Sequence, residues 1–143
     1  MYKHNKRSNY INENYIEGHG KPIYIDDLKY LIKLAENSIC KIKYFRTIGT
    51  GFFFKQNISN IKFYNKFFLM TNNHVLNEDF FENSFQLLIE FKNKEILIPL
   101  NNRIKYTNEK LDFTIIEILS QDTFFSEITF LTFQLNNNKK FFL

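Results

Sequence analysis

A series of short strand-like segments constrains the fold most, because only one other segment of the chain has helical periodicity. The segments are rich in β-branched and aromatic residues and are separated by turn residues; they cover residues 39–45, 52–54, 67–71, 85–91, 95–100 and 111–119. No helical pattern lies between them, so the sequence predicts antiparallel strands in a sandwich or a barrel. The fifth segment is open to extension through residues 104–106, with Pro99 marking a bulge or a sheet edge.

One amphipathic helix is predicted ahead of the strands, over residues 26–37. Its apolar residues repeat at the i, i+3, i+4, i+7 spacing of a helix face and are Leu28, Leu31, Ile32 and Ala35. Asp26 or Asp27 can cap the start of this helix, and Asn37 can end it.

The 143 residues suffice for one domain with a core, and three regions are predicted within them. Residues 1–37 form a polar N-terminal arm followed by the helix. Residues 38–119 form a mainly β domain, a single six-stranded antiparallel β-barrel. Residues 120–143 form a linker-like tail with room for one more strand before a cluster of Asn and Lys.

Charge and cysteine content favour an intracellular protein that binds neither nucleic acid nor membrane. The net charge is +4, but Lys and Asn are scattered and form no basic block, which is typical of a solvated surface. No run of about 18 apolar residues is present, and the charged start has no apolar region behind it, so neither a membrane span nor a secretory signal is expected. A single cysteine excludes an intramolecular disulfide and fits the cytoplasm.

His74 is the residue best placed for chemistry, because it follows a strand and a polar corner. Residues 67–70 are apolar, Thr71, Asn72 and Asn73 form the corner, and the pattern is apolar again after the histidine. The other two histidines lie in the polar arm. A strand that ends in this way presents the histidine side chain at the rim of a sheet.

Asp112 begins the sixth strand-like segment and is a candidate partner for His74. In a small antiparallel barrel, strand ends that are distant in sequence can meet at one rim. A carboxylate that accepts from one imidazole nitrogen fixes the tautomer of the ring and stabilises its cation, which is the base-and-orienter half of a nucleophilic site. A lone His and Asp are more often structural, and Asn72 and Asp112 can equally be turn formers.

Two other candidates are weighed and set aside. Cys40 lies in the first strand and is expected to be a buried structural thiol rather than a nucleophile. His4, His19, His74 and Cys40 contain no close pair with zinc-ligand spacing, so no metal and no cofactor is predicted.

Three blocks of sequence together resemble the first half of a trypsin-like serine peptidase, a double β-barrel fold. They are Gly-Thr-Gly-Phe-Phe at 49–53, Leu-Met-Thr-Asn-Asn-His-Val-Leu at 69–76 and Leu-Asp-Phe-Thr-Ile-Ile-Glu-Ile at 111–118. Their order is that of the family, and with the strands around them they cover about one barrel. The resemblance implies that His74 is the general base and Asp112 its orienting partner, and that Gly49 and Gly51 let their strand pass close to the substrate.

The second block departs from the family pattern at the histidine corner. Val75 stands where many secreted members carry a disulfide cysteine, so the chain resembles the disulfide-free branch. Asn72 and Asn73 replace small residues. Neither difference removes catalytic capacity.

The nucleophile of the family has no counterpart in the sequence. In the family a second barrel supplies a Gly-Asp-Ser-Gly-type loop that carries the serine and the oxyanion hole. All four glycines precede His74, Ser120 and Ser126 have no glycine neighbours, and the tail is too short for another barrel. The resemblance therefore predicts a serine peptidase fragment that is inactive alone in peptide-bond hydrolysis.

Two alternatives stay open beside the peptidase fragment. The first is a degenerate peptidase barrel that acts as a non-catalytic protein-binding module. The second is an unrelated β-barrel that binds nucleic acid, against which the lack of a basic or aromatic platform argues. The expected partners are a protein or peptide substrate, if a second barrel completes the site, and further copies of the chain through an exposed apolar flank.

Overall fold

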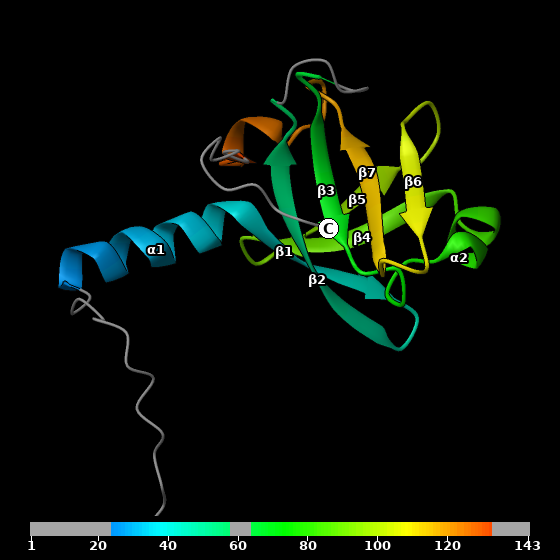
Figure 1. Ribbon diagram of the computed structural model, residues 1–143, viewed down its shortest axis with the longest axis horizontal. Coiled ribbons are helices and arrows are strands. Elements are labelled where there is room, and N and C mark those ends of the chain that lie inside the picture. The colour runs from blue at the N-terminus through cyan, green and yellow to red at the C-terminus, as the bar shows by residue number, and fades with distance from the viewer. Residues whose placement is uncertain (1–23, 58–63, 133–143) are drawn as a thin grey trace, which may run out of the picture.

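The computed structural model describes residues 24–57 and 64–132, which form one curled β-sheet with a projecting N-terminal helix (Figure 1). The helices are α1 (Ile25–Ser38), α2 (Glu78–Asn83) and the 3-10 helix η1 (Phe125–Glu127). The strands are β1 (Ile39–Tyr44), β2 (Thr47–Lys55), β3 (Phe67–Thr71), β4 (Gln86–Phe91), β5 (Lys94–Pro99), β6 (Lys105–Asn108), β7 (Phe113–Ile118) and β8 (Leu131–Thr132). The predicted arm over residues 1–22 lies outside the described residues, as do residues 133–143.

The mainly β, antiparallel architecture predicted from the sequence is confirmed. Seven strands follow the order β5-β4-β1-β2-β3-β7-β6, and each neighbouring pair is antiparallel. The sheet curls into a half-barrel around the core. Along β4 the side chains alternate between the two faces of the sheet. Leu87, Ile89 and Phe91 are buried on the face toward the core, while the residues between them are not.

The prediction of a closed six-stranded barrel is wrong. The strand order ends at β5 on one side and at β6 on the other, and these edges exchange no backbone ladder. Closure requires paired edges, but β6 has only four residues and β5 ends at Pro99, which has no N–H to donate. The predicted fifth strand with its extension is in fact β5 and β6 on opposite edges of the sheet.

A buried arginine occupies the connection between the two edge strands. The Arg103 guanidinium forms a two-pronged ion pair with Asp122, with nitrogen–oxygen distances of 2.6 and 2.7 Å, and its Nε donates to the Pro99 carbonyl. Both charged side chains are less than 10% exposed. The ion pair holds the segment after β7, which carries Asp122, against the connection between β5 and β6.

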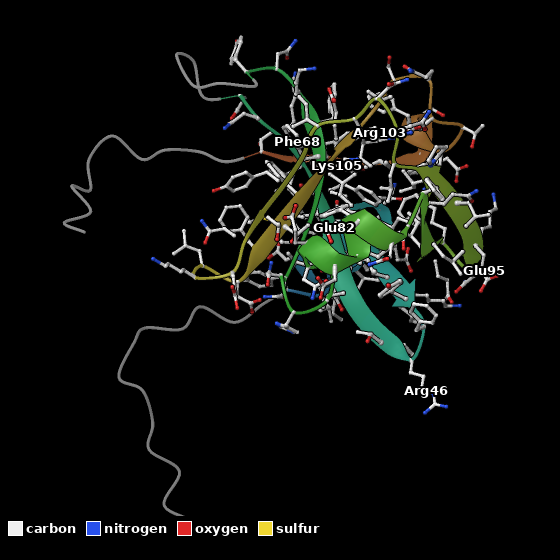
Figure 2. All side chains as sticks on the ribbon, turned by 90° about the vertical axis from the view of Figure 1, so that its right-hand side faces the viewer. Arg46, Phe68, Glu82, Glu95, Arg103 and Lys105 are labelled. Carbon is white, nitrogen blue, oxygen red and sulfur yellow. The ribbon has the colours of Figure 1, made fainter. Side chains whose placement is uncertain are left out.

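Arg46, in contrast to Arg103, lies at the outer end of the β1–β2 hairpin and points away from the sheet (Figure 2).

The predicted helix is confirmed as α1, but its apolar face is not covered by the rest of the described chain. Leu28, Leu31 and Ile32 are each about half exposed. Figure 1 shows α1 projecting from the sheet beside β1. The helix is anchored at its C-terminal end, where the buried Ser38 hydroxyl donates to the Thr129 carbonyl at 2.6 Å.

β8, the last strand in the described residues, pairs with a strand from near the start of the described chain. β8 pairs in parallel with β2 through Phe54 and Leu131. Just before it, the Thr129 N–H donates to the Asn37 carbonyl at 2.8 Å. The tail predicted to hold one more strand therefore contains a short one.

α2 is a helix that the sequence did not predict. The Asn77 side chain accepts from the Phe80 N–H at 3.1 Å and caps the helix, and acidic residues occupy its first turn. Phe80 is 1% exposed and joins the core. Within the described residues, no helix has the length and apolar character needed to cross a membrane.

Candidate active site

Sheet topology brings His74 and Asp112 to the same rim. β3 and β7 are antiparallel neighbours, with Thr71 paired to Thr114. The end of one strand therefore lies beside the start of the other. His74 lies three residues beyond the end of β3, and Asp112 directly precedes β7, so the predicted pair is brought together.

The corner after β3 is folded by backbone hydrogen bonds and by two apolar anchors. The N–H groups of Val75 and Leu76 donate to the Asn72 carbonyl at 3.2 and 3.3 Å. Val75 and Leu76 are both buried, whereas His74 between the corner and these anchors is exposed. The Thr71 hydroxyl donates to the Thr50 carbonyl at 2.9 Å and ties the end of β3 to β2. Burial of its neighbours thus points the histidine outward.

Gly49 leaves the space into which the histidine corner packs. A Cβ atom at this position would lie 2.4 Å from one Val75 methyl group and 2.7 Å from the other. A Cβ at Gly51 would meet the side chains of Leu69 and Ile42 at less than 3 Å. Gly49 and Gly51 are therefore required for packing around β2, and the substrate role that the resemblance gives them stays a prediction.

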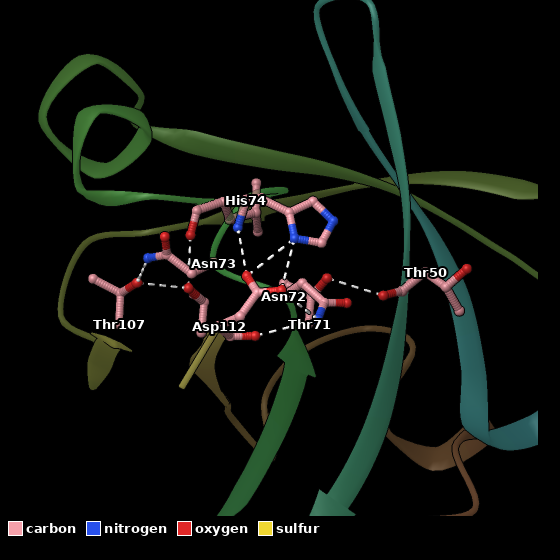
Figure 3. Close-up of polar contacts among 9 residues, drawn as sticks. Thr50, Thr71, Asn72, Asn73, His74, Thr107 and Asp112 are labelled. Atoms are coloured by element: carbon pink, nitrogen blue, oxygen red, sulfur yellow. Dashed lines mark hydrogen bonds and ion pairs between the residues drawn. The ribbon is translucent and has the colours of Figure 1, made fainter. Parts of the chain in front are cut away.

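A chain of hydrogen bonds connects the histidine corner to two neighbouring strands. The Thr114 hydroxyl donates to the Leu76 carbonyl at 2.6 Å, so the 2.8 Å contact between the Thr107 and Thr114 hydroxyls has Thr107 as donor. Thr107 in turn accepts from the Asn73 amide (Figure 3). The chain runs in one direction from Asn73 to Leu76 and links the corner to β6 and β7.

The carboxylate of Asp112 faces the His74 ring and the His74 backbone together. The ring Nδ1 lies 2.8 Å from Oδ2 and 3.0 Å from Oδ1, and the backbone N–H donates to Oδ1 at 3.0 Å. An ionised carboxylate only accepts, so the proton of the neutral ring is on Nδ1. The lone pair is then on Nε2, which points away from Asp112 in Figure 3.

These contacts favour the ionised form of Asp112. The pKa of Asp112 is lowered from its ordinary value of 3.8, chiefly by the backbone N–H of His74. Desolvation opposes this shift, and the His74 ring and, least of all, the Asn72 amide add to the lowering. The side chains of His74 and Asp112 are 70% and 45% exposed, so the pair is open to solvent.

The described residues place neither a nucleophile nor a metal at this pair. Each hydrogen bond that the His74 ring forms within residues 24–57 and 64–132 goes to Asp112. Cys40 is buried as predicted, and burial raises the pKa of its thiol to about 12. The buried Ser38 donates to Thr129 instead. In the same part of the chain, no group of three or more His, Cys, Asp or Glu residues could hold a metal ion.

A hollow of about 750 Å³ lies elsewhere, between the end of α1, the β1–β2 hairpin and the β4–β5 hairpin. It is lined by Ala35, Glu36, Asn37, Ile39, Cys40, Lys41, Ile48, Gly49, Thr50, Glu90, Lys92 and Asn93. Neither His74 nor Asp112 lines it. Gly49 and Thr50 of its lining, however, contact Val75 and Thr71 of the histidine corner, so the hollow adjoins the corner on the β2 side.

The sequence did not identify the residues that support the pair. Asn72 was interpreted as a turn former or a neutral replacement, yet its side chain donates to Asp112. Thr107 and Thr114 had no assigned role. Asn72 and Thr114 lie within the family-like blocks beside the two candidate strand ends, whereas Thr107 lies in β6 and has no signal of this kind.

The comparisons with known proteins found nothing similar. No family model, no curated protein and no solved structure matched this chain. A relation to trypsin-like peptidases therefore stays a prediction from the sequence blocks.

Proposed function

We propose that the half-barrel is the first barrel of a trypsin-like serine peptidase and supplies the base and orienter of its active site. The observation that carries the proposal is the contact of the Asp112 carboxylate with both the ring Nδ1 and the backbone N–H of His74, at 2.8–3.0 Å. Two strand ends that lie 38 residues apart in sequence are needed to form it.

In this function, the Nε2 atom of His74 takes the proton of a serine hydroxyl as the oxygen attacks a peptide carbonyl. The Asp112 carboxylate holds Nδ1–H in place and stabilises the imidazolium that forms. The same proton then passes from Nε2 to the leaving amine. The serine and the oxyanion donors belong to a second barrel in the family that the chain resembles.

The test is to sequence the DNA that follows codon 143 and to express the continuous chain. A Gly-Asp-Ser-Gly-like motif in any frame, with peptide hydrolysis that is blocked by a serine-directed phosphonate and abolished by H74A, is the expected result. D112N should lower kcat by about 10⁴-fold, as expected when an orienting carboxylate is lost. Hydrolysis that is unchanged in H74A would overturn the proposal.

A second candidate function is a non-catalytic protein-binding module. The exposed apolar face of α1 favours it, since Leu28, Leu31 and Ile32 are uncovered by the described chain. A stable, monodisperse 143-residue chain with no coding sequence after codon 143 would support this candidate over the peptidase.

A further inference from the structure

The Asn72 side chain lies on the far side of Asp112 from the main chain of His74 (Figure 3). Its Nδ2 atom lies 3.1 Å from the Asp112 carboxylate Oδ2 and 3.2 Å from the Asp112 backbone carbonyl oxygen. Both oxygens can only accept, so the amide group must present its NH₂ end to them. One nitrogen with two hydrogens satisfies both contacts.

Formation of the turn does not require the side-chain amide of Asn72. The corner is closed by the Asn72 backbone carbonyl, which accepts from Val75 and Leu76. Any residue would supply that carbonyl. The side-chain amide has no role in the turn and is directed at Asp112 instead.

We propose that Asn72 is a positioning residue that holds the Asp112 carboxylate in register with the His74 ring. The inference rests on the proposed function for its catalytic meaning. Asn72 and His74 thus act on Asp112 together, with His74 on both carboxylate oxygens and Asn72 on Oδ2 and on the backbone carbonyl oxygen.

The backbone of Asp112 gives this contact a second effect. Asp112 has a φ of 48°, in the left-handed region that is unfavourable for a residue with a side chain. Two hydrogen bonds hold Asp112 in that conformation. The Asn72 amide donates to the Asp112 carbonyl, and the Asp112 N–H donates to the Glu109 carbonyl. The Asp112 side chain is 45% exposed, so in the absence of the Asn72 amide a water molecule would replace it as a donor to Oδ2.

The test compares N72A with N73A in the 143-residue protein. Asn73 is a matched control, because it is the same residue type in the same corner and its amide contacts Thr107 rather than Asp112. The readouts are the Asp112 carboxyl titration by ¹³C NMR and the low-field His74 Nδ1–H resonance by ¹H NMR. Amide spectra of β4 residues monitor the fold.

N72A is expected to raise the pKa of Asp112 and to broaden or abolish the Nδ1–H resonance, whereas N73A, which loses only the bond to Thr107, should change both signals less. N72S serves if N72A does not fold, since it keeps a small polar turn residue but lacks the amide. Wild-type values in folded N72A or N72S overturn the inference, as does an equal effect of N73A.

The outcomes separate this inference from the proposed function. If N72A alters the two NMR signals but the extended chain hydrolyses no peptide, the peptidase proposal fails and Asn72 remains the residue that positions Asp112. If H74A abolishes hydrolysis but N72A leaves both signals unchanged, the peptidase proposal stands and the role of Asn72 is wrong.

Discussion

The Thr114 hydroxyl donates to the Leu76 carbonyl at 2.6 Å, and both residues are fully buried. This bond joins the β7 strand next to Asp112 to the segment that follows His74. The two halves of the candidate site are therefore linked in the interior as well as through the exposed histidine–aspartate pair.

Thr114→Val should destabilise the fold because valine keeps the shape of threonine but leaves the buried Leu76 carbonyl without its donor. An unsatisfied buried carbonyl costs about 1–3 kcal/mol of the free energy of unfolding. Urea unfolding measures the loss. Thr47→Val, at an exposed strand position, is the control and should change stability by less than about 0.5 kcal/mol. Equal values for the two variants would show that the bond contributes nothing.

Gly49→Ala should destabilise the chain because its new methyl group overlaps Val75. Overpacking of this kind costs about 1–3 kcal/mol. Val75→Ala removes the overlapping methyl groups, so the double variant should be more stable than the sum of the two single effects predicts. Chemical denaturation of the wild type and the three variants gives the coupling free energy, and additive effects would contradict the contact.

Stability should depend on pH through Asp112. Its folded pKa lies below the ordinary value of 3.8, so its contribution to stability is fully present above that value and is lost as pH falls through the folded pKa. Asp112→Asn removes the titration. The difference in the free energy of unfolding between wild type and D112N should shrink as the pH falls below 4. A difference that grows below pH 4 would reverse the assigned direction of the shift.

Arg103→Met should be far more destabilising than Arg46→Met. Arg103 is paired with Asp122 where both side chains are buried, and removing one partner of such a pair costs about 3–5 kcal/mol. Arg46 is exposed at the hairpin tip and serves as the control (Figure 2). Thermal and urea unfolding compare the two. The R103M/D122L double variant should recover part of the loss, because it leaves no unpaired charge.

The 143-residue chain should not hydrolyse peptides in a His74-dependent manner, since within the described residues no hydroxyl or thiol bonds to the His74 ring. Fluorogenic peptide pools incubated with wild type and with H74A should both react at the buffer rate. Turnover by the wild type that H74A removes would place a nucleophile within these residues.

Local patterns were sufficient to predict α1 and most strands, but not the closure of the sheet. The apolar spacing of residues 26–37 matches Ile25–Ser38, and the segment 67–71 is β3. α2 has six residues, fewer than two helical turns, so no periodicity could show it. The separation of β5 from β6 depends on pairing across the sheet and on Arg103, neither of which leaves a local pattern.

The candidate site shows the same division. His74 and Asp112 were predicted from strand ends and from the family resemblance, and the structure places them in contact. The Asn72 contact could not be predicted, because an asparagine in a corner has the same sequence signature whether its side chain or its backbone carbonyl forms the bonds.

The pairing of β8 with β2 has a consequence for biosynthesis. The Ser38 hydroxyl and the Thr129 carbonyl are joined across 91 residues, and β2 lacks its parallel neighbour until Leu131 has been made. A nascent chain on the ribosome would hold β2 with this edge unpaired during most of its synthesis. Contacts of such long range form slowly and leave apolar strands open to misassembly. β2 therefore completes its pairing only when residues 131 and 132 are available, after the other seven strands have been made.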